Sequence, residues 1–412
     1  MRRHKIDYEL AFAFRNTRIW KKIFEDELFA IRLPGRGKGK IGYCCITGRE
    51  GVHKALSVYI GAAGLNTLRK VLRVYDETAD EDTHDVSQLL IHDCVQCSIE
   101  AADEFDDEEL EEAMEYARAH KLRAPYPRFR RHRPHTIPWY IQDKKDWDAI
   151  EKGLRITVAL SEALASHKKA ELGIGDAGLS DIPGFFRAFE EPTIPLFELD
   201  ASGKLTMERV PLPPDEPETY RKPKHLNELD MAKLKKAGKT GTLQCEVVRL
   251  PSPVQDVENE APYLPAVMLA VQEDTGMVLP VYLVPGADYD PDEMASAFMQ
   301  SLLKSDIYPD RIAVGNEEAA AILEELCERT GILLVRDDEL PELEEARESL
   351  MAHMRGEDIS SHSDRLREMI DTLMRMSMDE LRTMPDEVRE MLASMMDRGL
   401  LPEELVKRLK KL

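Results

Sequence analysis

Cys94 and Cys97 are separated by two residues, which is the spacing of half a four-ligand zinc site. No second Cys-x-x-Cys pair in the sequence completes the set. Both residues fall in an apolar, strand-like run, where a free cysteine packs as a small hydrophobic side chain. We therefore expect buried thiols, no metal and no cofactor, with Cys94 and Cys97 as weak metal candidates.

Three further patterns resemble binding loops but lack the surroundings that such loops need. Residues 173–178 match Gly-x-Gly-x-x-Gly, yet a long predicted helix precedes them where a dinucleotide site requires a strand. Residues 35–40 resemble a phosphate loop, but Ile41 replaces the hydroxyl residue that follows the lysine. Residues 288–292 begin like a calcium loop without its later Gly and Glu, and instead predict a helix start.

The most basic stretch, residues 128–135, follows the most acidic stretch, residues 100–115. Our interpretation is mutual compensation, because arginine pairs well with carboxylates. The alternative is an anion-binding or nucleic-acid patch with aromatic stacking. The candidate binding residues are Arg128, Arg130, Arg131, Arg133 and Trp139.

The composition limits the classes of partner. Lys and Arg number 56 against 78 Asp and Glu, a formal net charge of −22, which disfavours general binding to nucleic acid or anionic membranes. No apolar run approaches the ~20 residues of a membrane helix, and the first residues lack a secretory pattern. Six cysteines in 412 residues are too few for a disulfide scaffold, so we expect a cytoplasmic protein.

Residues 1–170 are predicted to form an α+β domain, from the spacing of their apolar residues. The expected helices are 7–24, 64–74, 106–120 and 143–167. The expected strands are 28–33, 41–47, 55–60 and 88–99. Residues 123–139, rich in proline and arginine, are expected to form a loop.

Residues 171–240 are predicted to connect two domains through a hairpin, 195–199 with 205–210, and a proline-rich segment. Residues 241–356 are predicted to form an α/β domain with the order βββαβαβ and parallel pairing. Its strands are expected at 242–250, 266–272, 277–284, 311–314 and 332–336, and its helices at 292–304 and 317–330.

The tail, residues 357–412, is predicted to be a short, methionine-rich set of helices. Helical spacing of methionine is typical of a small core, and methionine-rich faces also bind partners adaptably. We expect a protein partner to bind through the helices of 361–412.

Parts of both halves resemble a family of uncharacterised bacterial proteins that pair two domains of unknown function. The resemblance rests on residues 56–61, the arginine-rich stretch before Pro138-Trp139, residues 263–265 and residues 274–276. It covers most of residues 5–350 and implies no established activity.

The βββαβαβ half also resembles the ribonuclease H and integrase core, through residues 311–316 and the helix that leads to Gly331-Ile332. That resemblance implies an RNase H-like fold, whose chemistry uses clustered carboxylates to hold two metal ions. Here Gly315 occupies the place of the second aspartate. The weak catalytic candidates are Glu246, Asn316, Glu342 and Glu345.

Nucleophile elbows, zinc-protease pairs and kinase loops are absent from the sequence. The leading hypothesis is therefore a non-enzymatic binding or adaptor protein. The alternative is a metal-dependent nuclease or other phosphodiester enzyme that uses Glu246 and the carboxylates of 342–345. The third is nucleic-acid binding through the arginines of 128–133.

Overall fold

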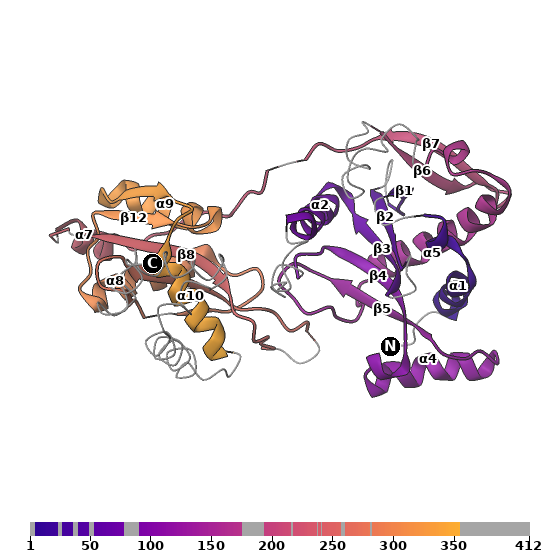
Figure 1. Ribbon diagram of the computed structural model, residues 1–412, viewed down its shortest axis with the longest axis horizontal. Helices are drawn as coiled ribbons and strands as arrows, with labels where there is room; N and C mark the ends of the chain where they lie inside the picture. The colour runs from indigo at the N-terminus through magenta and orange to yellow at the C-terminus, as the bar shows by residue number, and fades with distance from the viewer. Residues whose placement is uncertain are drawn as a thin grey trace, which may run out of the picture. The chain divides into compact units, whose positions relative to one another are not determined.

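Two β-sheets with packed helices form the described part of the chain in a computed structural model (Figure 1). The described residues are 5–354 apart from 24–26, 36–39, 49–52, 78–89, 175–192, 216, 237, 240, 257–259 and 281. They include eight α-helices, which confirms the mixed α/β character. The chain divides into two units, Met1–Asp338 and Glu339–Leu412, and each is described by itself.

The first sheet has seven strands in the order β5-β4-β3-β2-β1-β6-β7. Its strands are β1 (Phe29–Arg32), β2 (Ile41–Thr47), β3 (Lys54–Ile60), β4 (Cys94–Glu100), β5 (Tyr126–His132), β6 (Thr193–Leu199) and β7 (Leu205–Pro211). Neighbours pair antiparallel except β1 and β6, which pair in parallel with Ala30 opposite Leu196. The central strands are buried on both faces, which agrees with their nearly continuous apolar runs.

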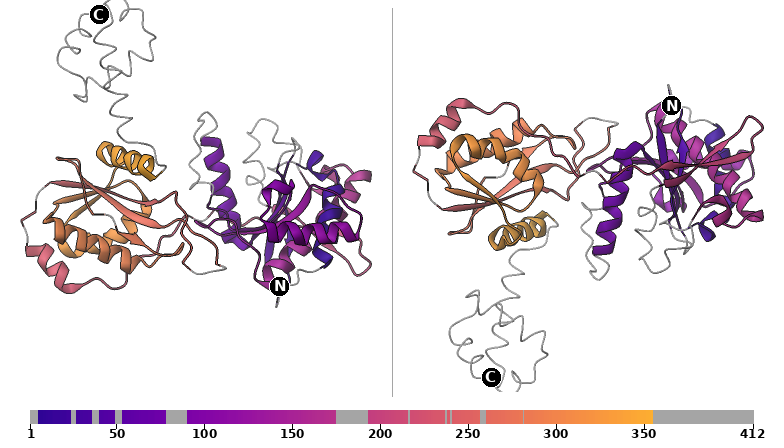
Figure 2. Two further views of the ribbon diagram at one scale, coloured as in Figure 1. Left: turned by 90° about the horizontal axis from the view of Figure 1, so that it is seen from below. Right: turned by 90° about the horizontal axis from the view of Figure 1, so that it is seen from above.

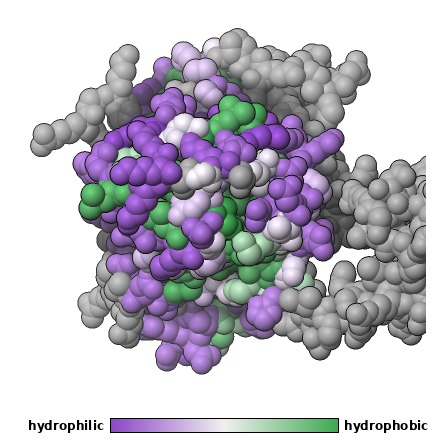
Figure 3. Space-filling view, turned by 90° about the vertical axis from the view of Figure 1, so that its left-hand side faces the viewer, coloured by the Kyte–Doolittle hydropathy of each residue, from purple (hydrophilic) through white to green (hydrophobic). Residues whose placement is uncertain are grey.

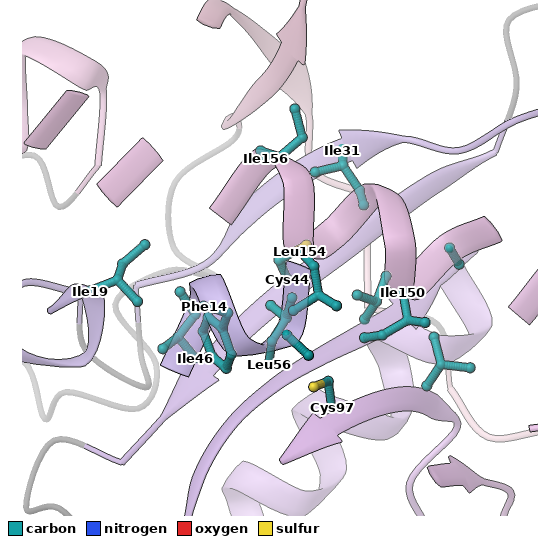
Figure 4. Close-up of a cluster of buried hydrophobic side chains, with 14 of the residues drawn as sticks. Phe14, Ile19, Ile31, Cys44, Ile46, Leu56, Cys97, Ile150, Leu154 and Ile156 are labelled. Atoms are coloured by element: carbon teal, nitrogen blue, oxygen red, sulfur yellow. The ribbon is translucent and has the colours of Figure 1, made fainter. Parts of the chain in front are cut away.

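Helices cover both faces of this sheet (Figures 1 and 2). Phe14 and Leu154 join Leu56 in a core on one face, part of which Figure 4 shows, while Leu65 and Tyr59 belong to a second core on the other. The helices of this half are α1 (Lys5–Asn16), α2 (Gly61–Glu77), α4 (Asp107–Ala119) and α5 (Lys144–Ser166).

Helix α5 approaches the sheet closely at Gly153. A Cβ added there would lie 2.8 Å from Val58 Cγ2, so only glycine fits at this distance. The glycine therefore belongs to the packing of α5 against β3.

The helix expected at 7–24 ends at Asn16, and two elements of the first sheet also differ from the sequence expectation. The arginine-rich stretch, expected to be a loop, contains strand β5 at the edge of the sheet. Proline and charged residues are tolerated in an edge strand. Here they hide the alternation of polar and apolar residues by which a strand is usually recognised. The hairpin of β6 and β7, expected in the connection between domains, extends the first sheet through β1.

The second sheet follows the order β10-β9-β8-β12-β13, with β11 paired to β9. Strands β8, β12 and β13 are parallel, while β9 is antiparallel to β8. The third expected strand is divided into β10 and β11. The bounds are β8 (Thr242–Arg249), β9 (Ala266–Gln272), β10 (Met277–Val278), β11 (Leu283–Val284), β12 (Arg311–Val314) and β13 (Leu333–Arg336).

One face of the second sheet packs on α7 (Glu228–Lys236), α8 (Pro291–Ser305) and α9 (Glu317–Thr330) (Figure 2). Cys245 and Val247 of β8 lie in that core. Asp290 caps α8 and Asn316 caps α9, each through a side-chain oxygen.

The surface seen in Figure 3 is covered mostly by hydrophilic side chains, with hydrophobic ones between them. None of the described helices combines the length and the apolar character that crossing a membrane would require. In the second unit, the structure describes α10 (Pro341–Met354). The methionine-rich helices expected at 361–412 lie outside the described residues.

Candidate functional site

Parallel strands β8 and β12 end side by side, and the residues at their carboxyl ends begin the site. Asn316, directly after Gly315, starts α9. Its side-chain oxygen accepts from Ala319 N at 2.9 Å, and its Nδ2 donates to Val247 O at 2.8 Å. Asn316 therefore caps α9 and fastens its start to β8, a positional role that leaves little of the amide for a ligand.

Arg249, the last residue of β8, is the charged group at this edge. Its Nη2 donates to Glu318 Oε1 at 2.9 Å, and the hydroxyl of Tyr289 donates to the same oxygen at 2.7 Å. The guanidinium carbon lies 5.0 Å from the centre of the Tyr289 ring, a cation–π distance. Burial and then the charge of Glu318 raise the pKa of Tyr289, so its hydroxyl stays protonated.

The Arg249 side chain is about nine-tenths buried, with 10% of its area exposed. Its Nε and Nη1 are buried and have no hydrogen-bond partner among the described residues. Leaving buried donors unsatisfied is costly, so such groups in proteins usually have a partner. Arg249 is therefore a nearly buried cation that Glu318 compensates among the described residues.

A cavity of about 910 Å³ opens beside Arg249 within the first unit. This volume is within the usual range for small-molecule sites. The wall contains four arginines and five large aromatic side chains, among other residues. They are Arg131, Arg133, Arg221 and Arg249, with Trp139, Tyr140, Tyr220, Tyr263 and Tyr289.

Backbone hydrogen bonds fix one wall of the cavity. His135 donates its amide to Leu90 O, and its carbonyl accepts from Leu264 N at 2.8 Å. Ile137 N donates to Pro262 O, also at 2.8 Å. His135 has a φ of 61°, an uncommon value for a residue other than glycine, and it marks the turn that carries Trp139 toward the cavity.

Most carboxylates of the wall already have partners. Asp93 pairs with Arg131, Glu218 pairs with Lys70, and Asp256 accepts from the Tyr263 hydroxyl. Asp288 pairs with Arg221 and Glu318 with Arg249. These pairings neutralise much of the negative charge that the wall residues would otherwise present.

The arginines differ in how many N–H groups remain. Arg131 donates to Asp93, Asp146 and two backbone carbonyls, which occupies most of its donors. Arg133 and Arg221 are about half exposed, and each has a single carboxylate partner among the described residues. Arg133 and Arg221 therefore retain exposed donors for a ligand, whereas the open donors of Arg249 are buried.

Residues 5–176 match the model of a domain of unknown function, DUF7309, and residues 230–351 match that of a second, DUF6930. The chain pairs two domains of unknown function. No curated protein matches the sequence. The pairing that the sequence resemblance implied is thus confirmed, and the cavity wall takes residues from both matched regions.

In the DUF7309 region, the predicted basic patch divides into two groups. Arg128 and Arg130 pair with Glu109 of α4, and Arg130 also lies 3.5 Å from Asp106. These contacts agree with mutual compensation between the basic and the acidic stretch. Arg131, Arg133 and Trp139 instead line the cavity.

The two candidate metal ligands of the DUF7309 region, Cys94 and Cys97, point to opposite faces of the first sheet. Cys94 belongs to the core on one face of the first sheet and Cys97 to the core on the other, because residues three apart in a strand point to opposite faces. Burial raises the pKa of Cys94 to about 12 and also raises the pKa of Cys97. Neither thiol is an accessible thiolate at neutral pH.

In the DUF6930 region, Glu246 alternates with Cys245 and Val247 and so projects from the sheet face opposite the α8–α9 core. Glu342 and Glu345 lie on α10, in the second unit. Among the described residues, no three histidine, cysteine or acidic side chains gather closely enough to hold a metal ion.

Sequence reasoning missed Arg221, Arg249, Tyr263 and Tyr289. The available signal was weak, because each of these residues stands alone in its own segment. Arg249 closes an apolar strand, where a charged residue at a carboxyl end is a common place for a ligand contact in α/β sheets. Only the fold brings the four together.

Proposed function

We propose that this protein is a non-enzymatic binding protein whose ligand site is the cavity beside Arg249. The observation that carries the proposal is the charge at the carboxyl edge of β8 and β12. A buried guanidinium and a capping amide occupy this edge, where metal-dependent phosphodiester chemistry would need clustered carboxylates. A cation site there would face the charge of Arg249.

The proposed fold of residues 241–338 is RNase H-like. Numbered by chain position within this half, and with β11 set aside, the sheet order is 3-2-1-4-5. The first strand is antiparallel to the second and parallel to the two strands that follow helices. Both connecting helices, α8 and α9, pack on one face, as expected for that core. This similarity to the RNase H core concerns the fold alone and implies no activity.

A cleavage assay tests the absence of catalysis. The full chain is incubated with labelled single- and double-stranded DNA and RNA in Mg²⁺ and in Mn²⁺. We expect no cleavage by the native chain, and identical traces for Glu246→Gln and for the surface variant Glu208→Gln. Metal-dependent cleavage that Glu246→Gln abolishes and Glu208→Gln retains would overturn the non-enzymatic proposal in favour of the nuclease alternative.

The adaptor part of the proposal concerns residues 361–412, which we propose as the protein-binding segment. Affinity capture from the source cells with the full chain should recover a stoichiometric protein, and capture with residues 1–356 should lose it. Equal recovery by the full chain and by residues 1–356 would contradict this role. The six cysteines, all free and buried among the described residues, support a reducing compartment such as the cytoplasm.

A further inference from the structure

We infer that the cavity beside Arg249 binds a nucleotide, with the phosphates on its arginines and the base against its aromatic side chains. This inference rests on the proposed binding function and names its ligand class. It is carried by the surplus of donors, the aromatic wall and the size of the cavity.

The donors of the wall exceed the acceptors that remain to meet them. Arg249 has two buried nitrogen atoms without a partner among the described residues, and Arg133 and Arg221 are half exposed. Among the carboxylates of the wall, that of Glu260 is the one that no described residue contacts by a hydrogen bond or an ion pair. In the described part of the chain, Arg133, Arg221 and Arg249 each have one carboxylate partner and keep further N–H donors, and phosphate is the group that arginine binds through paired N–H donors.

Arg221 and Arg249 both contact Tyr289. Arg221 Nη2 donates to the backbone carbonyl of Tyr289, while Arg249 lies over the ring of the same residue. Arg249 also donates to Glu318 in the first turn of α9, which is the positive end of that helix. A phosphate beside these groups would accept from the half-exposed Arg221 and lie near the positive charge of Arg249.

The aromatic residues provide a surface for a base. Trp139 and Tyr140 lie with their ring centres 5.0 Å apart on the 137–142 segment, and Tyr220 precedes Arg221 in the chain. Bases stack on such rings whatever their sequence identity. A volume of about 910 Å³ holds a ligand with a base, a sugar and phosphates, whereas a lone phosphate would leave most of it unfilled.

Isothermal titration calorimetry of the full chain tests the inference, with ATP, GTP, CTP and UTP as probes and with adenosine and inorganic phosphate as fragments. We expect at least one nucleoside triphosphate to bind, and each fragment to bind about ten-fold or more weakly. Arg221→Gln and Arg133→Gln should each weaken the nucleotide about ten-fold, because a charge-assisted bond to phosphate is lost. Arg249→Lys, which keeps the charge but not the paired donors, should also weaken binding.

Arg329→Gln is the matched control, since Arg329 is a partly exposed arginine of α9 that pairs with Glu228 and Glu325, away from the cavity wall. Its affinity should equal that of the native chain. An equal loss in this variant, or no binding of any triphosphate, would overturn the inference. Tighter binding of a 15-nucleotide single strand than of any mononucleotide would also overturn it, in favour of a polymer. Absence of nucleotide binding together with absence of cleavage would leave the non-enzymatic proposal standing, so the two failures are distinguishable.

Discussion

Arg130→Met is expected to lower the free energy of unfolding by about 3–5 kcal/mol, the usual cost of removing one partner from a buried ion pair. Glu109 has only 1% of its side chain exposed, and Arg130 contacts both of its carboxylate oxygens. Arg128 stays 3.3 Å from one of these oxygens and compensates part of the charge. Urea denaturation of the native chain and the variant at about pH 7.5 measures the difference.

A matched control separates burial from the substitution itself. Arg155→Met breaks an exposed pair with Glu151 on α5 and should cost no more than about 0.5 kcal/mol. The double variant Arg130→Met with Glu109→Met removes both charges and should be more stable than Arg130→Met alone. Equal losses in the two single variants would contradict the buried-pair explanation.

The pH dependence of the same variant provides a second test. Burial raises the pKa of Glu109 and the charge of Arg130 opposes that rise, so removing Arg130 leaves burial to dominate. The folded variant then favours protonated Glu109, and its deficit relative to the native chain should narrow as the pH falls toward about 5.5. A packing defect without a charge would give a deficit independent of pH.

The Arg130–Glu109 pair also shows how far the sequence leads. Compensation between the acidic and basic stretches follows from their proximity in the chain and from elementary electrostatics. The strand that presents these arginines does not follow, because Phe129 is nearly alone as an apolar marker and Pro127 argues against a central strand. Only the position of β5 at a sheet edge makes that sequence compatible with a strand.

Most elements were predictable because their apolar residues repeat at helical or strand spacing. Helix α5, expected at 143–167, spans Lys144–Ser166, and the expected order βββαβαβ after residue 241 is met except that the third strand is divided into β10 and β11. The parallel pairing of β1 with β6 was not predictable, because it joins residues more than 160 positions apart and leaves no local pattern. The domain boundaries at residues 170, 240 and 356 stay predictions.

The cavity was unpredictable for a related reason. Its wall combines the 131–142 segment, residues 218–221, the end of β8 and the turns before α8. Each segment carries one or two arginines or tyrosines, which a sequence alone cannot distinguish from ordinary surface residues. Their convergence depends on the backbone bonds of His135 and Ile137, which are tertiary contacts.

Acidification is expected to destabilise the protein well above the pH at which carboxylates titrate, because of buried histidines. Burial lowers the pKa of His92 to about 4, and burial together with His92 and Arg131 lowers the pKa of His132 to about 3. His92 accepts or donates a hydrogen bond with the Tyr59 hydroxyl at 2.7 Å, while Nε2 of His132 has no partner among the described residues. Among the residues that the structure describes, neither ring has a carboxylate partner that would stabilise its charged form.

Proton linkage determines the direction in which the free energy of unfolding changes with pH. In the unfolded chain these histidines have the ordinary pKa of about 6.5, so between that pH and about 4 the unfolded state binds more protons than the folded state. These histidines do not destabilise the folded state above pH ~6.5. They lower the free energy of unfolding progressively as the pH falls toward their folded pKa values of about 4 and about 3. At about pH 5.5 each histidine should remove about 1.4 kcal/mol from the free energy of unfolding, relative to about pH 7.5.

Urea denaturation at several pH values between about 7.5 and 5.5 measures this loss, and His132→Phe identifies its source. The variant should lose less stability on acidification than the native chain, by about 1.4 kcal/mol, because one proton no longer distinguishes the two states. His167→Gln, at the exposed end of α5, is the control and should lose as much unfolding free energy as the native chain when the pH is lowered. A His132→Phe profile parallel to that of the native chain would mean that His132 charges in the folded state, and that the T-shaped contact of its ring with His92 tolerates the charge.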